Sequence, residues 1–473
     1  MNVIILGAGL VGWQLARQLV YEGKEVTLIE KNPEEARRAA DRLDCRVVTG
    51  EGNSVPVLRR AGIENADFFV SVTESDEINM IACSLVAAEY SEPVTVARVR
   101  NVAYSASRMV RQRLYGIDHV INPEIEAARA VIRSLERGAV GTVNPFAGSG
   151  LSMTSITIDG GCPLIDRSVR SIRSSTGGEF LLPLLIRDGQ SVIPTGDTMV
   201  KKGDMLYVIA GPEGTDSLIA AAGLRRRELR RIAIAGGGRI GRYVADYLLG
   251  RSDDGDDDGS TGAWSRIFER FRRRPPNRSV HFIERSYTVG RQLAADYPGA
   301  LVTNADISDE EVSEAGLLEG YDLMVSATGN QELNLVSALH AKNHGVGRTI
   351  ALVRKASYVT MAREMGVDVT VSVTDTMVNS ILRILRKGNV RSIHAITGSE
   401  FEIIDFLLES DSALVGRAIR DLKLPKNSLI LMVNRGEDFL LPDGDLVIDD
   451  GDRVVVITPR EAVKKLEEAV VGS

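Results

Sequence analysis

The sequence predicts an α/β protein in which one unit occurs twice, each unit being a parallel-sheet domain followed by a small α+β subdomain. Three observations predict this. The stretches "IILGAGLVG" (4–12) and "IAIAGGGRIG" (232–241) are glycine-rich turns, each entered from an apolar strand. Each turn is followed by an apolar run that ends in an acid, Glu30 or Glu284. Later segments also match, such as 196–209 with 444–457, so a duplication that kept both copies explains the chain.

Within copy one, short β-rich runs alternate with helical patterns over roughly the first 135 residues. The spacing of these runs predicts a parallel sheet with helices on both faces; the runs are "MNVIILG", "EVTLIEK", "RVVTGE", "FFVSVT", "VTVARV" and "HVINP". The next segments, "SMTSITI", "FLLPLLIRDGQSVIPTGD" and "DMLYVIA", alternate in polarity and contain hairpin-type turns. They predict the small α+β subdomain.

These patterns predict four domains, joined in the middle by "AAGLRRRELRRI" (221–232). The two parallel-sheet domains are expected at 1–135 and 229–387, and their subdomains at 136–222 and 388–473.

Copy two carries an insertion, because the glycine turns lie 229 residues apart whereas the following acids lie 254 apart. It is visible at 251–279, where an acidic, Gly/Ser-rich part is expected to be disordered. The rest is either a solvated appendage or a short basic amphipathic helix that touches a partner or a membrane surface. Its apolar face would consist of Trp264, Ile267, Phe268 and Phe271.

Composition excludes several classes of protein. The 57 Lys and Arg against 64 Asp and Glu give a net charge of −7, which does not favour a nucleic-acid partner. No apolar run approaches the roughly 20 residues that span a bilayer, and the N-terminus lacks the basic start of a signal peptide. Three scattered cysteines without a CxxC pattern indicate a reducing compartment. We therefore expect a cytoplasmic protein.

The first glycine turn has the features of a dinucleotide site of the Rossmann type. Gly7 permits the tight turn, Gly9 lets a pyrophosphate approach, and Gly12 lets the helix pack on the sheet. The intervening Ala8, Leu10 and Val11 complete the loop, whose helix start attracts phosphate. Glu30 is expected to bind the ribose hydroxyls, which favours NAD(H) over NADP(H).

The second turn repeats this arrangement with Glu284 as its acid and a loop of Gly236, Gly237, Gly238, Arg239, Ile240 and Gly241. For both turns the alternative is that the glycines serve only the close packing of strand and helix, without any ligand. In the second copy this alternative has more weight, because one of two duplicated sites is often degenerate.

Further polar residues follow the other strands. Glu51 or Asn53 could reach the adenine edge, as could Asp306 in copy two, although loop capping explains them equally well. Thr73 and its counterpart Thr328 are placed near the phosphates or nicotinamide, in competition with helix capping.

Two arginines, Arg98 and Arg100, share one face of a strand end, which suits a charged phosphate tail. Copy two keeps Arg354 but has Leu352 in place of the first, so the two sites could hold different nucleotides. A surface salt bridge is the alternative role for each arginine.

No catalytic group is evident. A dehydrogenase needs an acid or base near the nicotinamide, and none of the five histidines is an obvious candidate. His340 and His344 are spaced for one helix face, but no third metal ligand is nearby. We therefore expect neither catalytic residues nor a metal site, with an NAD-dependent oxidoreductase as the alternative.

Several segments resemble a known family. "IILGAGLVG", "VTLIEKNPE", "AGIENADFFVSVTESDEIN", "VARVRN" and "GIDHVINPE" resemble the N-terminal domain of regulator-of-potassium-conductance (RCK) proteins. "CPLIDRSVRSI" and "GDTMVKKGDMLYVIAG" resemble the RCK C-terminal subdomain. The tandem order is similar to the cytosolic NAD-binding subunits of bacterial Trk potassium uptake systems.

The resemblance implies a regulator that does not catalyse a reaction. It implies a homotetrameric ring of eight RCK units, peripheral to the inner face of the cell membrane, which gates a membrane potassium-conducting subunit of the Trk type (TrkH-like). It also implies that NAD(H), ATP or ADP binds at the glycine loops, with Arg100 and Arg354 among the contacts. An RCK-type regulator of a different transporter is the alternative. Glu51 and Gly52 stand where the family often has Asp-Ala.

Overall fold

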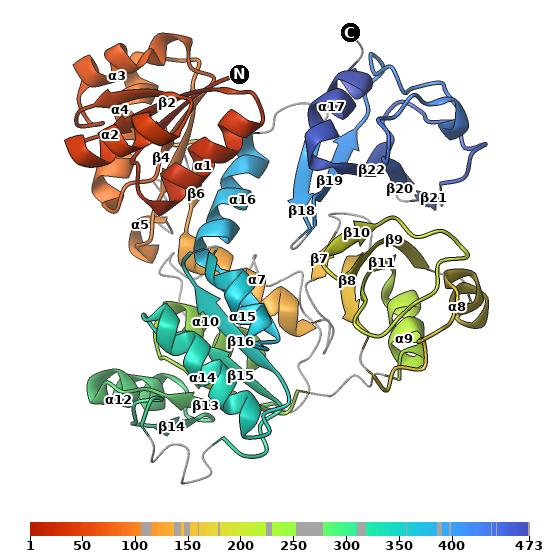
Figure 1. Cartoon of the computed structure of the whole chain (residues 1–473). Helices are drawn as coiled ribbons and strands as arrows, with labels where there is room; N and C mark the ends of the chain where they lie inside the picture. Colours follow the sequence, from red (N-terminus) through yellow and green to blue (C-terminus); the bar gives the residue numbers. More distant parts are fainter. Residues whose placement is uncertain are drawn as a thin grey trace. The chain divides into compact units, whose positions relative to one another are not determined.

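The chain is described here by a computed structural model (Figure 1). The described residues are 1–105, 115–136, 143–145, 152–158, 160–177, 180–223, 229–251, 278–309, 318–355, 357–385, 390–396, 399–436, 438–440 and 442–471. They form two compact units, the first from residues 1–132 and 229–385 and the second from 133–228 and 386–473. The amphipathic segment expected around Trp264 lies outside the described residues.

The first unit contains two six-stranded parallel sheets, one from each copy. In copy one the order is β3-β2-β1-β4-β5-β6, and copy two repeats it as β14-β13-β12-β15-β16-β17. This confirms the predicted doubly wound fold, in which strand order reverses beside the first strand. The copy-one strands are β1 (Asn2–Leu6), β2 (Glu25–Glu30), β3 (Arg46–Thr49), β4 (Phe68–Ser71), β5 (Val94–Arg98) and β6 (His119–Ile121). Those of copy two are β12 (Arg231–Ala235), β13 (Ser279–Ile283), β14 (Leu301–Thr303), β15 (Leu323–Ser326), β16 (Thr349–Val353) and β17 (Val369–Ser372).

Helices cover these sheets, and some of them begin at a side-chain cap. The Asn32 side chain accepts a hydrogen bond from the Glu34 amide, and Ser75 Oγ accepts one from the Ile78 amide. Copy one has α1 (Leu10–Tyr21), α2 (Pro33–Arg42), α3 (Val55–Ala61), α4 (Asp76–Glu89), α5 (Val102–Ser105) and α7 (Pro123–Glu136). Copy two has α10 (Arg239–Leu248), α12 (Tyr287–Asp296), α14 (Gln331–Asn343), α15 (Ser357–Glu364) and α16 (Val373–Leu385).

Helix α16 belongs to copy two but packs on copy one, where it lies along α1 (Figure 1). Its apolar face is fully buried in one cluster with residues of β1 and α1, including Met377, Ile381 and Leu385 from α16 and Ile5 and Leu15 from copy one. Helix α16 is therefore part of the hydrophobic core of copy one, and its burial there stabilises the association of the two N-terminal domains.

Polar contacts fix the position of the shared helix. The Gln14 side chain of α1 donates a hydrogen bond to Asp375 at the start of α16. Further along, Ser380 Oγ donates to the carboxylate of Glu126 on α7 at 2.6 Å, and Glu126 also pairs with Arg129. Since Glu126 and Ser380 are buried, their partners satisfy groups that would otherwise be costly to bury.

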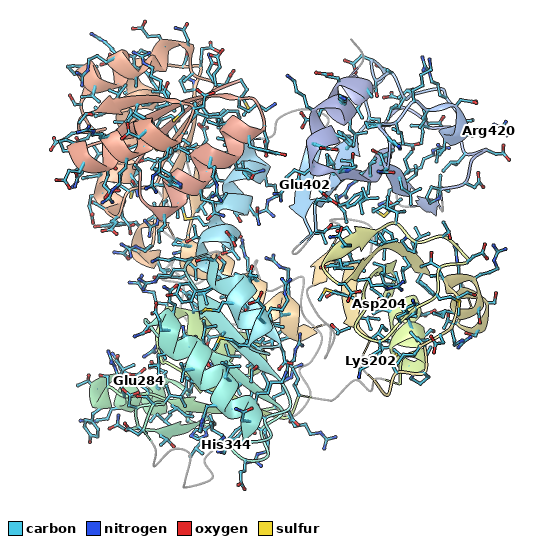
Figure 2. All side chains as sticks on the ribbon, viewed as in Figure 1. Lys202, Asp204, Glu284, His344, Glu402 and Arg420 are labelled. Atoms are coloured by element: carbon cyan, nitrogen blue, oxygen red, sulfur yellow. The ribbon has the colours of Figure 1, made fainter. Side chains whose placement is uncertain are left out.

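The second unit contains two five-stranded antiparallel sheets of identical order, which confirms the α+β subdomains. In each, an arginine forms a two-pronged ion pair with a buried aspartate: Arg187 with Asp204, and Arg435 with Asp452. Asp204 is labelled in Figure 2. The sheets contribute to one apolar cluster. Their strands are β7 (Val143–Pro145), β8 (Ser152–Thr157), β9 (Phe180–Arg187), β10 (Gln190–Val192), β11 (Met205–Ala210), β18 (Val390–Ala395), β19 (Phe401–Leu407), β20 (Leu429–Arg435), β21 (Asp438–Leu440) and β22 (Arg453–Pro459). Helices α8 (Val169–Ser175), α9 (Pro212–Ala221) and α17 (Val463–Val471), with short 3₁₀ turns, complete the unit.

Candidate functional site

The three glycines of the first turn have distinct geometric roles. Gly7 has a φ of +104°, which side-chain-bearing residues rarely adopt. A Cβ on Gly12 would lie 1.9 Å from the carbonyl oxygen of Gly7, so no other residue fits between helix and loop. A Cβ on Gly9 would meet nothing within 4 Å, because this position faces open space. The loop is thus shaped by Gly7 and Gly12 and left accessible at Gly9.

The second turn repeats this geometry. Gly236 has a φ of +102°, a Cβ on Gly241 would lie 2.3 Å from the Gly236 carbonyl oxygen, and Gly238 faces open space. The sequence pattern therefore specifies the same backbone in both copies.

Glu30, at the end of β2, connects two loops. One carboxylate oxygen accepts a hydrogen bond from the Ala8 amide at 2.7 Å and the other accepts one from the Asn32 amide at 2.8 Å. Glu284 makes the equivalent contacts with the amides of Gly237 and Ser286, both at 2.7 Å. Each acid lies against its glycine loop, as expected of a residue that binds the ribose next to a pyrophosphate.

A cavity of about 800 Å³ opens above the first glycine loop and is lined by both copies. It contains most of the candidate residues of copy one: Gly7, Ala8, Gly9, Leu10, Val11, Glu30, Glu51, Asn53, Thr73, Arg98 and Arg100. From copy two it contains Gly238, Arg239, Ile240, Thr328 and Arg354. The remaining candidates are not among its lining residues: Gly12, Gly236, Gly237, Gly241, Glu284 and Asp306.

Thr73 is held at the cavity wall by Asn79, which is fully buried at the start of α4. The Asn79 side-chain oxygen accepts hydrogen bonds from the amide and hydroxyl of Thr73, and its nitrogen donates to the carbonyl oxygens of Thr73 and Arg98. Asn334 serves Thr328 in the same way. These asparagines connect the ends of two neighbouring strands, a role that their motif alone did not reveal.

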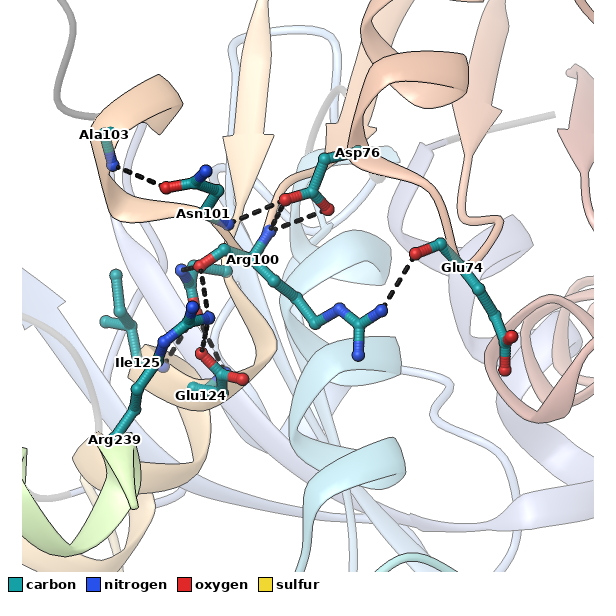
Figure 3. Close-up of polar contacts among 9 residues, drawn as sticks. Glu74, Asp76, Arg100, Asn101, Ala103, Glu124, Ile125 and Arg239 are labelled. Carbon is teal, nitrogen blue, oxygen red and sulfur yellow. Dashed lines mark hydrogen bonds and ion pairs between the residues drawn. The ribbon is translucent and has the colours of Figure 1, made fainter. Parts of the chain in front are cut away.

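The two arginines of copy one lie side by side at the cavity. Arg98 Nη1 donates to the Thr73 carbonyl at 2.9 Å, while its buried Nε has no partner among the described residues. Burial, followed by repulsion from Arg100, lowers the pKa of the Arg98 guanidinium. Arg100 donates to the Glu74 carbonyl at 2.8 Å, and Asp76 accepts from the Arg100 backbone amide (Figure 3). An anion entering here would compensate the positive charge.

A third guanidinium comes from copy two. Arg239 begins α10, and its Nη1 donates to the Glu124 carboxylate at 3.0 Å and to the Arg100 carbonyl at 3.2 Å (Figure 3). The bond to Glu124 raises the pKa of Arg239. Glu124 was not predicted as a site residue. In the sequence Glu124 is simply an acidic residue in the first turn of α7, which is a common position for an acid and does not indicate a binding site.

Other cavity residues also escaped prediction. Val373, Thr374 and Met377, at the start of α16, line the cavity, although Glu284 of the same copy does not. Nothing in their local pattern indicates a ligand, because their position depends on which sheet α16 covers.

The described part of the chain contains no cluster of three or more His, Cys, Asp or Glu able to hold a metal ion. Across the same residues, no helix combines the length and apolar character needed to cross a membrane. His281 is buried within β13 and its ring nitrogens contact the hydroxyls of Tyr321 and Thr303.

Comparison with known proteins identifies both kinds of domain. The TrkA-N domain family matches residues 3–123 and 265–373, and the TrkA-C domain family matches 153–223 and 403–470.

Curated relatives match over nearly the whole chain. The Trk system potassium uptake protein TrkA of Azorhizobium caulinodans is 31% identical, covering 99% of this chain and 98% of its own. TrkA homolog 1 of Methanosarcina mazei is 29% identical, covering 99% of each.

Among solved structures, the GsuK channel aligns with a TM-score of 0.57 at 18% identity, over 99% of this chain and 78% of its own. The GsuK channel bound to NAD aligns with a TM-score of 0.56, with the same identity and coverage. These two show the fold, and the sequence matches show the family: the chain belongs to the TrkA family of Trk-system potassium uptake proteins.

Proposed function

We propose that the chain is a regulatory subunit of potassium uptake that binds NAD(H), with ATP and ADP as alternative or additional ligands, and changes conformation with the nucleotide bound. The observation that carries this proposal is the cavity that joins the Gly9 loop, Glu30 and a group of arginines. Membership of the TrkA family and the NAD-bound GsuK relative support the ligand class.

The residues present fit NAD(H). The α1 start and the open Gly9 position receive the pyrophosphate, and Glu30 receives the adenosine ribose hydroxyls. A carboxylate at this position repels a 2′-phosphate, so NAD(H) is preferred over NADP(H). Arg98 and Arg100 receive whatever anionic group extends beyond the loop.

The cavity also places a bound ligand in contact with helix α16, through which it can affect the rest of the first unit. Thr374 and Met377 line the cavity, while the apolar residues further along α16 are buried against copy one. A nucleotide that fits one placement of α16 better than another shifts the balance between the two placements, by an amount limited to its difference in affinity. Regulation then needs no catalytic residue.

The partner and the assembly are part of the same proposal. We place the chain in a homotetrameric ring, cytoplasmic and peripheral to the inner membrane face, controlling a TrkH-like potassium-conducting subunit. The four domains lie at 1–135, 136–222, 229–387 (with the 251–279 insertion) and 388–473. Co-purification of a membrane partner with the tagged chain tests the assignment to a Trk system, and a different transporter in the eluate would replace it.

Calorimetric titration with NADH, NAD, ATP and ADP tests the ligand proposal directly. We expect binding that differs among the four, that weakens in Arg100→Ala, and that is not accompanied by NADH turnover with carbonyl substrates. Absence of binding by all four would refute the proposed function. Steady turnover would favour an oxidoreductase instead.

A further inference from the structure

We propose that each chain binds a single nucleotide, with its adenosine on copy one and its far end against the glycine loop of copy two. This inference rests on the proposed function and assigns the second glycine loop a new role. Copy two has lost its own adenosine subsite, and its loop has become the far wall of the copy-one site.

The lining of the cavity is the first support, because the two copies contribute different parts. Copy one contributes the adenosine end, with Glu30, Asn32, Glu51 and Asn53. Copy two contributes the start of α10 and the ends of β15 and β16, but neither Glu284 nor Asp306 is among the lining residues. A ligand that fills this cavity would have its adenosine on copy one and its other end facing copy two.

The loop after β14 is the second support, because two positions that are polar in copy one are apolar here. Ala305 and Ile307 occupy the positions of Glu51 and Asn53, and Ile307 is only 8% exposed within an apolar cluster. The carboxylate of Asp306 accepts hydrogen bonds from the amide of Ser308 at 3.0 Å and from the hydroxyl of Ser308 at 2.7 Å. These bonds lower the pKa of Asp306 and hold its carboxylate against its own loop.

The distribution of cations is the third support. Arg98 and Arg100 lie in copy one, and Arg239 of copy two reaches the same region through its contact with the Arg100 carbonyl. In the other copy Leu352 stands at the position of Arg98 and Leu10 at that of Arg239, whereas Arg354 corresponds to Arg100 and also lines the cavity. A ligand with an anionic tail is therefore attracted to the copy-one site, where three guanidiniums converge.

The second glycine motif persists for reasons that do not involve a ligand. Gly236 is required by its positive φ and Gly241 by the 2.3 Å approach to the Gly236 carbonyl. Glu284 is required because it accepts hydrogen bonds from the amides of Gly237 and Ser286. The motif therefore maintains the fold of copy two even without an adenosine of its own.

Calorimetric titration of the full chain with NADH and with ADP tests the proposal through its stoichiometry. We expect one ligand per chain. Two ligands per chain would overturn the inference but leave the proposed function standing, whereas no binding at all would defeat the proposed function itself.

Two matched substitutions extend the test. Glu30→Gln is expected to weaken binding at least about tenfold, since hydrogen bonds to a charged group are lost, whereas Glu284→Gln leaves the stoichiometry at one ligand per chain. Arg239→Ala is expected to weaken ADP binding about tenfold while stoichiometry stays at one. An Arg239→Ala protein that binds like wild type, or a Glu284→Gln protein that loses a site, would overturn the inference.

Discussion

Replacing Gly9 by aspartate should raise stability and abolish nucleotide binding at the same time. Gly9 is the N-cap residue of α1, with φ −65° and ψ −175°, and no side chain caps the helix there. Because a Cβ at this position meets nothing within 4 Å, the substitution introduces no clash. An aspartate in this conformation can accept a hydrogen bond from the exposed amides of the first turn and interacts favourably with the helix dipole.

The two effects differ in size. Capping and dipole together should stabilise the protein by about 0.5–1 kcal/mol. Against a bound pyrophosphate, a carboxylate about 4 Å away costs about 4 kcal/mol at an effective dielectric constant of about 20. That penalty corresponds to roughly a thousandfold loss of affinity.

The assay pairs calorimetric titration of NADH with thermal unfolding, using Gly9→Asn as the control. Asparagine caps the helix comparably but carries no charge, so its stability should match that of the aspartate variant while its affinity falls less. An aspartate variant that binds NADH normally would refute the placement of the pyrophosphate. One that unfolds at a clearly lower temperature would refute the geometry of the loop.

Three further predictions concern the fold around the site. Gly12→Ala places a Cβ 1.9 Å from the Gly7 carbonyl oxygen and should destabilise the protein by about 1–3 kcal/mol, measured by urea unfolding; unchanged stability would contradict the packing of α1 on its loop. Ile381→Ala empties a fully buried position of α16 and should cost about 2–5 kcal/mol, and a loss below 1 kcal/mol would argue against the shared core. Burial lowers the pKa of His281 to about 4, so its neutral form is favoured on folding. The contribution of His281 to the unfolding free energy should therefore be constant above about pH 6.5 and fall by about 3 kcal/mol as the pH drops to 4. In His281→Gln this part of the pH dependence should disappear, and an unaltered slope would reject the assignment.

Much of the fold was predictable because its determinants are local. The apolar runs, their spacing and the glycines predicted both parallel sheets and the turns between strand and helix. The backbone at Gly7 and Gly12 follows from steric limits that act within a few residues. The position of Glu30 beside its loop follows as well, because β1 and β2 are parallel neighbours whose carboxyl ends meet at one edge.

Other features depend on pairs of residues that are distant in sequence. Gly52 departs from the family pattern because a Cβ there would lie 2.1 Å from Leu6 Cδ1. In copy two the smaller Ala235 replaces Leu6, and Asp306 replaces Gly52. The dependence of residue 52 on the size of residue 6 becomes visible only when β1 and the loop after β3 are placed side by side.

The sequence by itself determined the two-copy organisation, the parallel sheets and the shape of each glycine loop, since these depend on local backbone geometry and on repeating apolar patterns. Only the tertiary structure decided that α16 covers the sheet of copy one and that Arg239 and Glu124 meet at one cavity. An apolar helix face specifies that it will be buried, but two similar sheets offer it similar surfaces. The choice between them depends on the fit of the assembled cores, which no single stretch of the chain encodes.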